Sequence, residues 1–360
     1  MPVTSPKRVL CASQKPPLMA EQTRNPGQNG EPLLIVEHLT RTFRVGGQVL
    51  RAVDDVSFEI RRGSTLGVVG ESGSGKSTLA RCVLRMIPFN EGAVIYDGVN
   101  LSTLRAREMR RMREHIQVVF QDPHGSLNRR LSVGEIISSP LLAHAVGDRT
   151  SRASKTRELL EIVGLPHAMI DRRPSELSGG QAQRVAIARA LALEPEFVVL
   201  DEAVSALDVS VRAQVLNLLR RLQDDLALTY LFITHDLSVA RYMAEEVVVM
   251  YQGRFVEEGS RSELFGDPRH PYTHSLMDAV AIVNPIRKDR RPQAALPSDV
   301  GDALQASGCR FHPRCPIGRN LPECQQDDPS ATSLQAGHLI RCHHPQSKDD
   351  WRDATGALEG

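Results

Sequence analysis

The residues best suited to chemistry lie in one glycine-rich stretch, Gly70-Glu71-Ser72-Gly73-Ser74-Gly75-Lys76-Ser77-Thr78. Its glycines, lysine and serine stand where the phosphate-loop pattern requires them. Glycines let successive backbone N–H groups point at a phosphate, and the helix that follows adds its dipole. We expect Lys76 to bridge the β- and γ-phosphates of a nucleotide, and Ser77 to offer its hydroxyl to Mg²⁺.

An acidic pair ends an apolar run and can complete this site. Val198-Val199-Leu200 predicts a strand buried on both faces, and this strand delivers Asp201 and Glu202 to the end of a sheet. We expect Asp201 to hold the Mg²⁺ shell and Glu202 to orient or deprotonate the attacking water. An acidic pair at a strand end usually lies in a solvated loop without a function. In a chain that also carries a phosphate loop, the catalytic interpretation is favoured.

Two more polar residues follow predicted strands. Gln121 comes after Val118-Val119-Phe120, where its amide can contact Mg²⁺ or water and sense the γ-phosphate. His235 comes after Leu231–Thr234, where it can donate a hydrogen bond to the γ-phosphate. Each is a weak signal by itself, since a histidine in such a place is more often structural. Their positions relative to the two main motifs make them candidates.

A second glycine-rich stretch, Leu177-Ser178-Gly179-Gly180-Gln181, opens a predicted helix. Ordinary capping explains Ser178, because serine is a good N-cap. Two consecutive glycines are costly unless something must approach the backbone closely, and a γ-phosphate is the obvious candidate. The two glycine-rich stretches lie too far apart to share one nucleotide, so the sequence predicts two chains that exchange ATP across an interface.

Short apolar runs alternate with helical patterns from about residue 33 to 259, which indicates an α/β fold. The predicted strands are Leu33–Leu39, Thr65–Gly70, Ala93–Tyr96, Ile116–Phe120, Phe197–Leu200, Thr229–Thr234 and Glu246–Met250. Helices are expected after Lys76, Ser178, Asp208 and Asp236, with a helical insert between Gln121 and Leu177. The predicted domains are a flexible tail at 1–32, a main domain at 33–266, a separate appendage at 267–345 and a frayed end at 346–360.

Composition excludes several function classes. The chain has 360 residues, 41% of them hydrophobic, so it can bury a large core with room for two domains. Its net charge of +1 gives no global field that points to nucleic acid or an anionic membrane. No apolar run approaches the ~20 residues that span a bilayer, and residues 1–32 lack the hydrophobic core of a signal peptide. We therefore expect a cytosolic protein whose membrane role depends on another chain.

Together these motifs resemble the nucleotide-binding subunit of an ABC transporter. In that family's terms Walker A is 70–78, the Q-loop is Gln121, the signature is 177–181 and the switch histidine is His235. Walker B ends at Asp201-Glu202, and the D-loop is 205–208. The resemblance implies a P-loop NTPase (RecA-like) core with an antiparallel β subdomain and an α-helical insert at about 122–175.

The resemblance also implies a head-to-tail dimer, in which ATP on one chain's Walker A is covered by the signature of the other. Ser178 and Gly180 would then act in trans, and Gly179, Gln181 and Asp208 would join the same nucleotide site. Phe43 resembles the aromatic residue that stacks on adenine. Membrane subunits would grip the helical insert through their coupling helices.

Two positions depart from the family's pattern. Ala203 and Arg129 stand where prolines are usual, beside functional positions but not in place of a reacting group. We expect activity to survive, with loop rigidity reduced.

A narrower likeness is to the oligopeptide/dipeptide importer ATPases, carried by residues 119–123, 126–128, 204–210, 213–219 and 270–273. Residues 92–98 are closer to the F-type subunit of these importers. The likeness implies ATP-driven uptake of peptides, with a D-type second ATPase, two permease subunits and a periplasmic or lipid-anchored solute-binding protein. It also implies peripheral attachment to the cytoplasmic face of the bacterial inner membrane. Nickel, glutathione and oligosaccharides stay open as cargo.

Four of the six cysteines, Cys309, Cys315, Cys324 and Cys342, fall in the last sixth of the chain. In a reducing compartment such a cluster favours a metal site over disulfides. The absence of a short Cys-x-x-Cys pair weakens a zinc-ribbon interpretation, and four thiolates can hold a [4Fe–4S] cluster. Residues 308–316 resemble the C-terminal segment of peptide-importer ATPases, some of which carry such a cluster. Zinc, with His312 or His343 replacing a cysteine, and no metal at all stay open.

Two rival functions remain. An ATPase that acts on nucleic acid could use the five arginines of residues 105–113 as a basic patch, although Glu108 and Glu114 interrupt the charge. Repair ATPases of the long-arm kind place a coiled coil between Walker A and the signature, and translation-type members carry two cassettes; this chain shows neither pattern. A regulatory cassette without a permease is the second rival.

Overall fold

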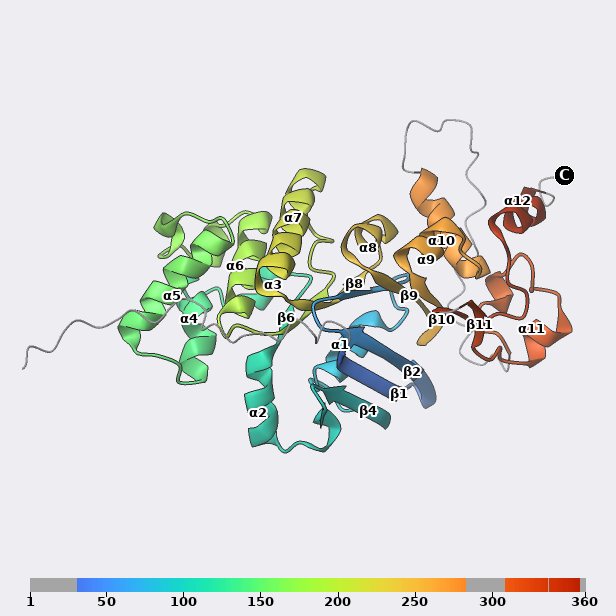
Figure 1. Cartoon of the computed structure of the whole chain (residues 1–360), viewed down its shortest axis with the longest axis horizontal. Helices are drawn as coiled ribbons and strands as arrows, with labels where there is room; N and C mark the ends of the chain where they lie inside the picture. The colour runs from blue at the N-terminus through green and yellow to red at the C-terminus, as the bar shows by residue number, and fades with distance from the viewer. Residues whose placement is uncertain (1–30, 283–307, 336, 357–360) are drawn as a thin grey trace, which may run out of the picture.

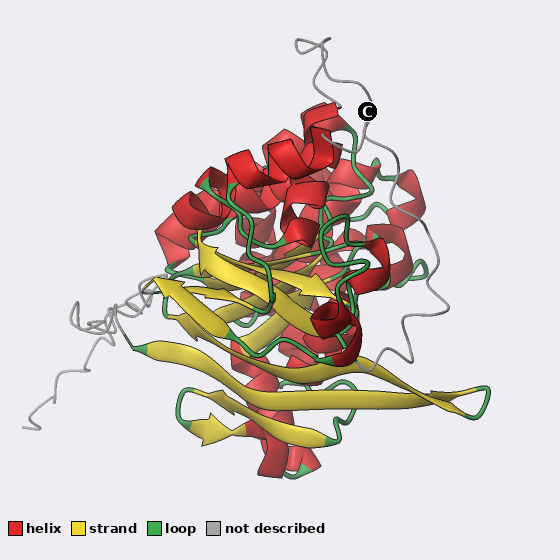
Figure 2. Ribbon diagram, turned by 90° about the vertical axis from the view of Figure 1, so that its right-hand side faces the viewer, coloured by secondary structure: helices red, strands yellow, loops and turns green. Residues whose placement is uncertain are grey.

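The computed structural model describes residues 31–282, 308–335 and 337–356. The predicted tail at 1–32 lies almost entirely outside the described residues, as do residues 283–307 of the predicted appendage. The described chain forms two sheets with helices packed around them (Figures 1 and 2).

The larger sheet has eight strands in the order β11-β12-β10-β9-β3-β8-β7-β6, and the strands from β9 to β6 are parallel. Its strands are β3 (Thr65–Val69), β6 (Ile116–Val119), β7 (Phe197–Asp201), β8 (Thr229–Thr234), β9 (Glu246–Tyr251), β10 (Arg254–Ser260), β11 (Thr332–Gln335) and β12 (His338–Ile340). Every residue of β3, β7 and β8 is buried. Phe197 and Val199 pack into one core while Val198 and Leu200 pack into another. Burial on both faces explains why these strands read as unbroken apolar runs.

Helices fill both cores. On the side of the smaller sheet lies α1 (Lys76–Val83), and on the other side α6 (Gly179–Leu191) and α7 (Val209–Leu226) cover β7 and β8. Outside the helical insert, this domain also contains α2 (Ala106–His115), α8 (Leu237–Met243) and α9 (Arg261–Gly266).

The smaller sheet is antiparallel, in the order β2-β1-β4-β5, and forms the lower layer of Figure 2. It consists of β1 (Pro32–Val45), β2 (Gln48–Arg61), β4 (Glu91–Tyr96) and β5 (Val99–Asn100). The sequence analysis missed β2, although its buried apolar residues alternate with exposed polar ones; its pairing with β1 is irregular near Asp55, which has a φ of 54°. An alternating strand of this kind is half exposed.

The helical insert contains α3 (Pro123–Ser126), α4 (Val133–Ala143) and α5 (Arg149–Ile162), which lie with α6 at the left of Figure 1. Ser132 and Asp148 cap α4 and α5 by accepting hydrogen bonds from backbone N–H groups. The insert shares one apolar core with α6 and α7. These elements confirm the predicted P-loop NTPase core with an antiparallel β subdomain and a helical insert.

The C-terminal region joins the main domain, where the sequence predicted a separate appendage. It includes α10 (Pro271–Ile282), α11 (Pro322–Gln326) and α12 (Lys348–Gly356), and β12 pairs with β10 to extend the larger sheet. At this joint Glu257, 1% exposed, receives a hydrogen bond from His338 at 2.8 Å. Burial would raise the pKa of Glu257, but the hydrogen bonds from His338 and from the backbone N–H groups of Arg269 and His270 hold its pKa below the ordinary value. The carboxylate therefore stays charged inside the joint.

A helix also occupies the end that the sequence predicted to be frayed. Trp351 of α12 is 5% exposed, stacks on His274 with ring centroids 5.1 Å apart and donates to Asp278 at 3.0 Å. These contacts of Trp351 join α12 to α10. In the described part of the chain, no helix is long and apolar enough to cross a membrane.

Candidate nucleotide-binding site

The strand order brings the predicted site residues to one edge of the larger sheet. The phosphate loop follows β3, Gln121 comes two residues after β6, Asp201 ends β7 and His235 follows β8 directly. These strands are parallel and adjacent, so their carboxyl ends meet at the same edge. Residues that are up to 165 positions apart in the sequence, from 70 to 235, are therefore brought to the same edge of the sheet.

The phosphate loop is shaped by close backbone contacts that only glycine tolerates. Gly75 has a φ of 107°, and a Cβ there would lie 2.1 Å from the carbonyl oxygen of Ala52 on β2. Gly70 has the same restriction, since its Cβ would lie 2.2 Å from the carbonyl oxygen of Met250. The loop is therefore clamped between β2 and the end of β9.

Lys76 is folded into this loop. The residue is 3% exposed, and its ammonium donates at 2.7 Å to the carbonyl oxygens of both Gly70 and Glu71. Burial lowers the pKa of Lys76, and the nearby carboxylates of Glu202 and Asp201 oppose that shift. A desolvated cation at the mouth of a glycine loop is suited to contact phosphate oxygens.

The predicted magnesium ligands lie side by side. Ser77 Oγ donates to Asp201 Oδ1 at 2.9 Å, which joins the first turn of α1 to the end of β7. Burial raises the pKa of Asp201, while the bond from Ser77 acts in the opposite direction. A hydroxyl and a carboxylate are oxygen ligands of the kind that Mg²⁺ prefers.

Glu202 and His235 form a second polar pair at this edge. His235 Nδ1 and Glu202 Oε2 lie 3.2 Å apart. Glu202 has a φ of 49°, an unusual value for a residue with a side chain, and its N–H donates to the carbonyl of Ile233 at 2.9 Å. Strained backbone held in place by its surroundings is often found at functional sites.

An open cleft of about 410 Å³ is lined by the phosphate loop, Gln121 and Glu202, while Asp201 and His235 are not among its lining residues. It is large enough for a nucleotide by comparison with usual ligand sites. The site residues predicted from the sequence that line this cleft are Phe43, Ser72, Gly73, Gly75, Lys76, Ser77, Thr78, Gln121 and Glu202. Phe43 lines the cleft, and the Arg41 guanidinium lies over its ring, 4.4 Å from the ring centre.

Five lining residues were missed by the sequence analysis. They are Leu50, Arg51 and Ala52 of β2 and Gln252 and Gly253 of the β9–β10 turn. The Gln252–Gly253 turn, with φ values of 43° and 86°, carries a tight-turn signal, but nothing in the sequence places it beside the phosphate loop.

The second glycine motif lies away from this cleft, since none of residues 177–181 lines it. Ser178 caps α6, accepting from the Gln181 N–H at 3.3 Å, while Gln181 Oε1 accepts from the Ser178 N–H at 3.0 Å. Gly180 has a reason within this chain, because a Cβ there would lie 2.3 Å from Val211 Cγ1 on α7. Close packing on α7 thus accounts for Gly180 without a phosphate. Asp208 precedes α7 and makes no side-chain cap bond.

The four C-terminal cysteines line one small pocket together with His270, His312 and His343. All four are unpaired thiols. A Cβ on Gly318 would lie 2.8 Å from Cys324 Sγ and 3.6 Å from Cys315 Sγ, so both thiols flank that glycine. Among the described residues, however, no three His, Cys, Asp or Glu side chains are grouped closely enough to hold a metal ion. The donor set fits a metal, but the thiols are not gathered as ligands.

The geometry of the cleft defines a class of protein: a P-loop ATPase of the ATP-binding cassette type. Residues 53–205 match the ABC transporter family model, and residues 256–324 match the oligopeptide/dipeptide transporter C-terminal region. A Brucella ovis protein provisionally named as a peptide import ATP-binding protein is 45% identical over 313 residues, covering 86% of this chain and 97% of the relative. The chain belongs to the ABC transporter family, among the ATP-binding proteins with this C-terminal region.

A further relative and two solved structures support the same family. Bacillus subtilis YkfD, provisionally named as an oligopeptide transport ATP-binding protein, is 44% identical over 315 residues, covering 87% of this chain and 95% of YkfD. A dimeric ATP-binding cassette solved in a post-hydrolysis state with ADP and Pi has a TM-score of 0.59 at 30% identity, covering 63% of this chain and 98% of its own. cbiO1 from Clostridium perfringens, part of the ABC transporter complex cbiONQ, has a TM-score of 0.60 at 26% identity, covering 71% and 97%.

The contact between Gly180 and Val211 generates a test. Gly180→Ala should lower the free energy of unfolding by about 1–3 kcal/mol, because the added methyl overpacks against Val211. Gly179→Ala is the matched control, since its Cβ would lie 3.6 Å from its nearest neighbour, Leu207 Cδ2. Chemical denaturation measures both. Adding Val211→Ala to Gly180→Ala should recover most of the loss, and a pair of effects that simply add would contradict the packing explanation.

Proposed function

We propose that this protein is the ATP-hydrolysing subunit of an ABC importer that takes up di- or oligopeptides. The observation that carries the proposal is a phosphate-loop cleft built onto a C-terminal region of the oligopeptide/dipeptide transporter type. The names of the Brucella and Bacillus relatives support peptides as cargo.

The proposed roles follow the contacts in the cleft. Lys76 binds the β- and γ-phosphates, while Ser77 and Asp201 hold Mg²⁺ with Gln121 beside them. Glu202 orients and deprotonates the attacking water, and His235, within 3.2 Å of Glu202, contacts the γ-phosphate. Adenine stacks on Phe43.

The proposed assembly supplies what a single chain lacks. Residues 177–181 lie outside this chain's own cleft, which supports their action on ATP bound to a partner ATPase of the D type. This chain is the F-type subunit, and two permease subunits contact the helical insert. A solute-binding protein delivers the peptide. The complex places this chain peripherally on the cytoplasmic face of the inner membrane.

Import is tested by co-expressing the chain with candidate permeases, its partner ATPase and a binding protein. We expect the chain to co-purify with the permeases from membranes, and vesicles holding the complex to take up labelled peptide with ATP. Glu202→Gln should abolish uptake while the complex still assembles and binds ATP. Glu194→Gln, an exposed glutamate away from the cleft, should leave uptake unchanged. A chain that stays soluble beside every candidate permease would contradict the proposal.

The shared interface is tested at Ser178. In the complex, Ser178→Ala should leave ATP binding to this chain's cleft within about twofold of wild type and lower hydrolysis at the partner's Walker A by ~10-fold or more. Ser260→Ala is the matched control, because Ser260 caps α9 by accepting from Glu263 N at 3.3 Å, as Ser178 accepts from Gln181 N on α6. Both changes remove a cap of about 1 kcal/mol. Equal hydrolysis in the two variants would argue for a capping role alone.

We also propose that Cys309, Cys315, Cys324 and Cys342 hold a [4Fe–4S] cluster. Their shared pocket and the backbone N–H of Gly318, which donates to Cys315 Sγ at 3.2 Å, support thiolate ligands. Such a cluster would act as a structural staple, with the thiols drawn inward on binding.

Anaerobic purification with iron, acid-labile sulfide and zinc analyses tests this assignment. Iron and sulfide should be present in equal amounts, and Cys324→Ser should remove most of both. Cys82→Ala, a buried cysteine outside the pocket, should keep them. Zinc in place of iron, or no metal in the anaerobic sample, would refute the cluster.

A further inference from the structure

The cysteine pocket and the nucleotide cleft are joined by two arginines. Arg310 follows Cys309 and Arg314 precedes Cys315, so each arginine is covalently next to a cysteine of the pocket. The Arg310 side chain donates to the Gln252 carbonyl oxygen, and the Arg314 side chain donates to Glu71 of the phosphate loop. The C-terminal segment therefore touches the nucleotide site directly.

Arg314 contacts the phosphate loop itself. Its NH1 and NH2 donate to the two carboxylate oxygens of Glu71 at 2.8 and 2.9 Å, which is a bidentate pair. The guanidinium lies 5.7 Å from the ring centre of Tyr251 and 5.9 Å from that of Phe311. The bond to Glu71 raises the pKa of Arg314, so the arginine remains a cation at any physiological pH. The Arg314 side chain is 18% exposed and that of Glu71 is 41% exposed, so solvent and salt screen part of the attraction between them.

Glu71 is held at a second point by the same region. The N–H of Glu71 donates to the hydroxyl of Tyr272 at 2.9 Å, and Tyr272 is fully buried in α10. Backbone and side chain of this one loop residue are thus fixed by two different C-terminal residues. Glu71 does not line the cleft, although its carbonyl oxygen accepts from Lys76.

The charge of Glu71 makes this arrangement matter for nucleotide binding. A free carboxylate in the phosphate loop would repel the phosphates and attract Lys76 away from them. Arg314 pairs with that carboxylate through both of its oxygens, and Glu71 is not among the residues that line the cleft.

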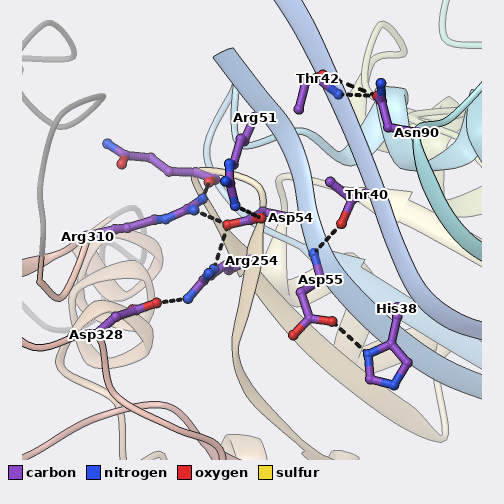
Figure 3. A network of polar contacts seen from close by, with 11 residues as sticks. His38, Thr40, Thr42, Arg51, Asp54, Asp55, Asn90, Arg254, Arg310 and Asp328 are labelled. Atoms are coloured by element: carbon purple, nitrogen blue, oxygen red, sulfur yellow. Dashed lines mark hydrogen bonds and ion pairs between the residues drawn. The ribbon is translucent and has the colours of Figure 1, made fainter. Parts of the chain in front are cut away.

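Arg310 contacts the lining of the cleft at a second place. It donates to the carbonyl oxygen of Gln252 and to Asp54, which also binds Arg51 and Arg254 (Figure 3). Gln252 and Arg51 line the cleft. Burial would raise the pKa of Asp54, but Arg310, Arg51 and Arg254 together hold it below the ordinary value, so the three arginines surround an anion.

We propose that Arg314 is a positioning residue for ATP binding, which acts by holding and neutralising Glu71 of the phosphate loop. The inference rests on the proposed function, because it requires ATP in this cleft. Through Arg314 the cysteine-bearing segment sets the affinity of the site for nucleotide.

The test measures the Kd of the full-length chain for a fluorescent ATP analogue, with KM and kcat for ATP in the assembled complex. Arg314→Ala should raise Kd and KM by ~5–10-fold and change kcat little, since Glu71 is left unpaired beside the phosphates. Arg319→Ala is the matched control, because Arg319 is an exposed arginine of the same segment and should leave Kd unchanged.

A second variant separates charge from folding. Glu71→Gln keeps the shape of the loop residue and removes its charge, so it should weaken ATP binding less than Arg314→Ala does. Added to Arg314→Ala, it should restore Kd close to the value of Glu71→Gln alone. The defect of Arg314→Ala should also shrink as salt concentration rises, which a loss of packing would not do.

The outcomes distinguish this inference from the proposed function. If the wild-type chain binds no ATP, the proposed function fails and this inference fails with it. If the wild type binds ATP and Arg314→Ala binds it equally well, only this inference is overturned. A weakened Arg314→Ala that Glu71→Gln does not rescue, with a defect independent of salt, would also overturn it.

Discussion

The site depends on one constraint: adjacent parallel strands are buried on both faces and end at the same edge of the sheet. Alternate residues of β7 pack into opposite cores, with Val199 on one side and Leu200 on the other. Each such side chain contributes about 1.5–3 kcal/mol when buried. A slip of one residue would exchange the two faces, so packing fixes the register of the strand. That register also fixes where Asp201 and Glu202 leave the sheet.

A second constraint closes the cleft from the other side. β2 and the β9–β10 turn press on the phosphate loop, and Asp54 ties them together through three arginines. Removing one member of such a group costs more than forming it gains, because the others are left with unpaired charge. One member, Arg310, comes from the C-terminal region. The nucleotide site is therefore a shared product of the smaller sheet, the larger sheet and the cysteine-bearing segment.

The sequence was sufficient to predict an element or a site residue where a local pattern had a single physical explanation. Unbroken apolar runs predicted β3, β7 and β8, and the polar residue after each run pointed to the site. It was insufficient where the explanation was a long-range contact. Arg51 lines the cleft only because β2 crosses the phosphate loop, and Gly180 is small because Val211 packs on it. α12 was missed because a short helix has little periodicity, and the contacts of Trp351 with His274 and Asp278 are long-range ones.

That tryptophan gives the molecule a built-in optical probe of limited range. Trp351 is the single tryptophan of the 360-residue sequence, and it lies in α12, stacked on His274 of α10. Its indole emission reports the environment at the C-terminal joint, far along the chain from β3 and the phosphate loop. Intrinsic fluorescence excited at wavelengths selective for indole will therefore report when α12 separates from α10. Unfolding of the helical insert will leave the tryptophan fluorescence unchanged unless it also disturbs the contact between α12 and α10.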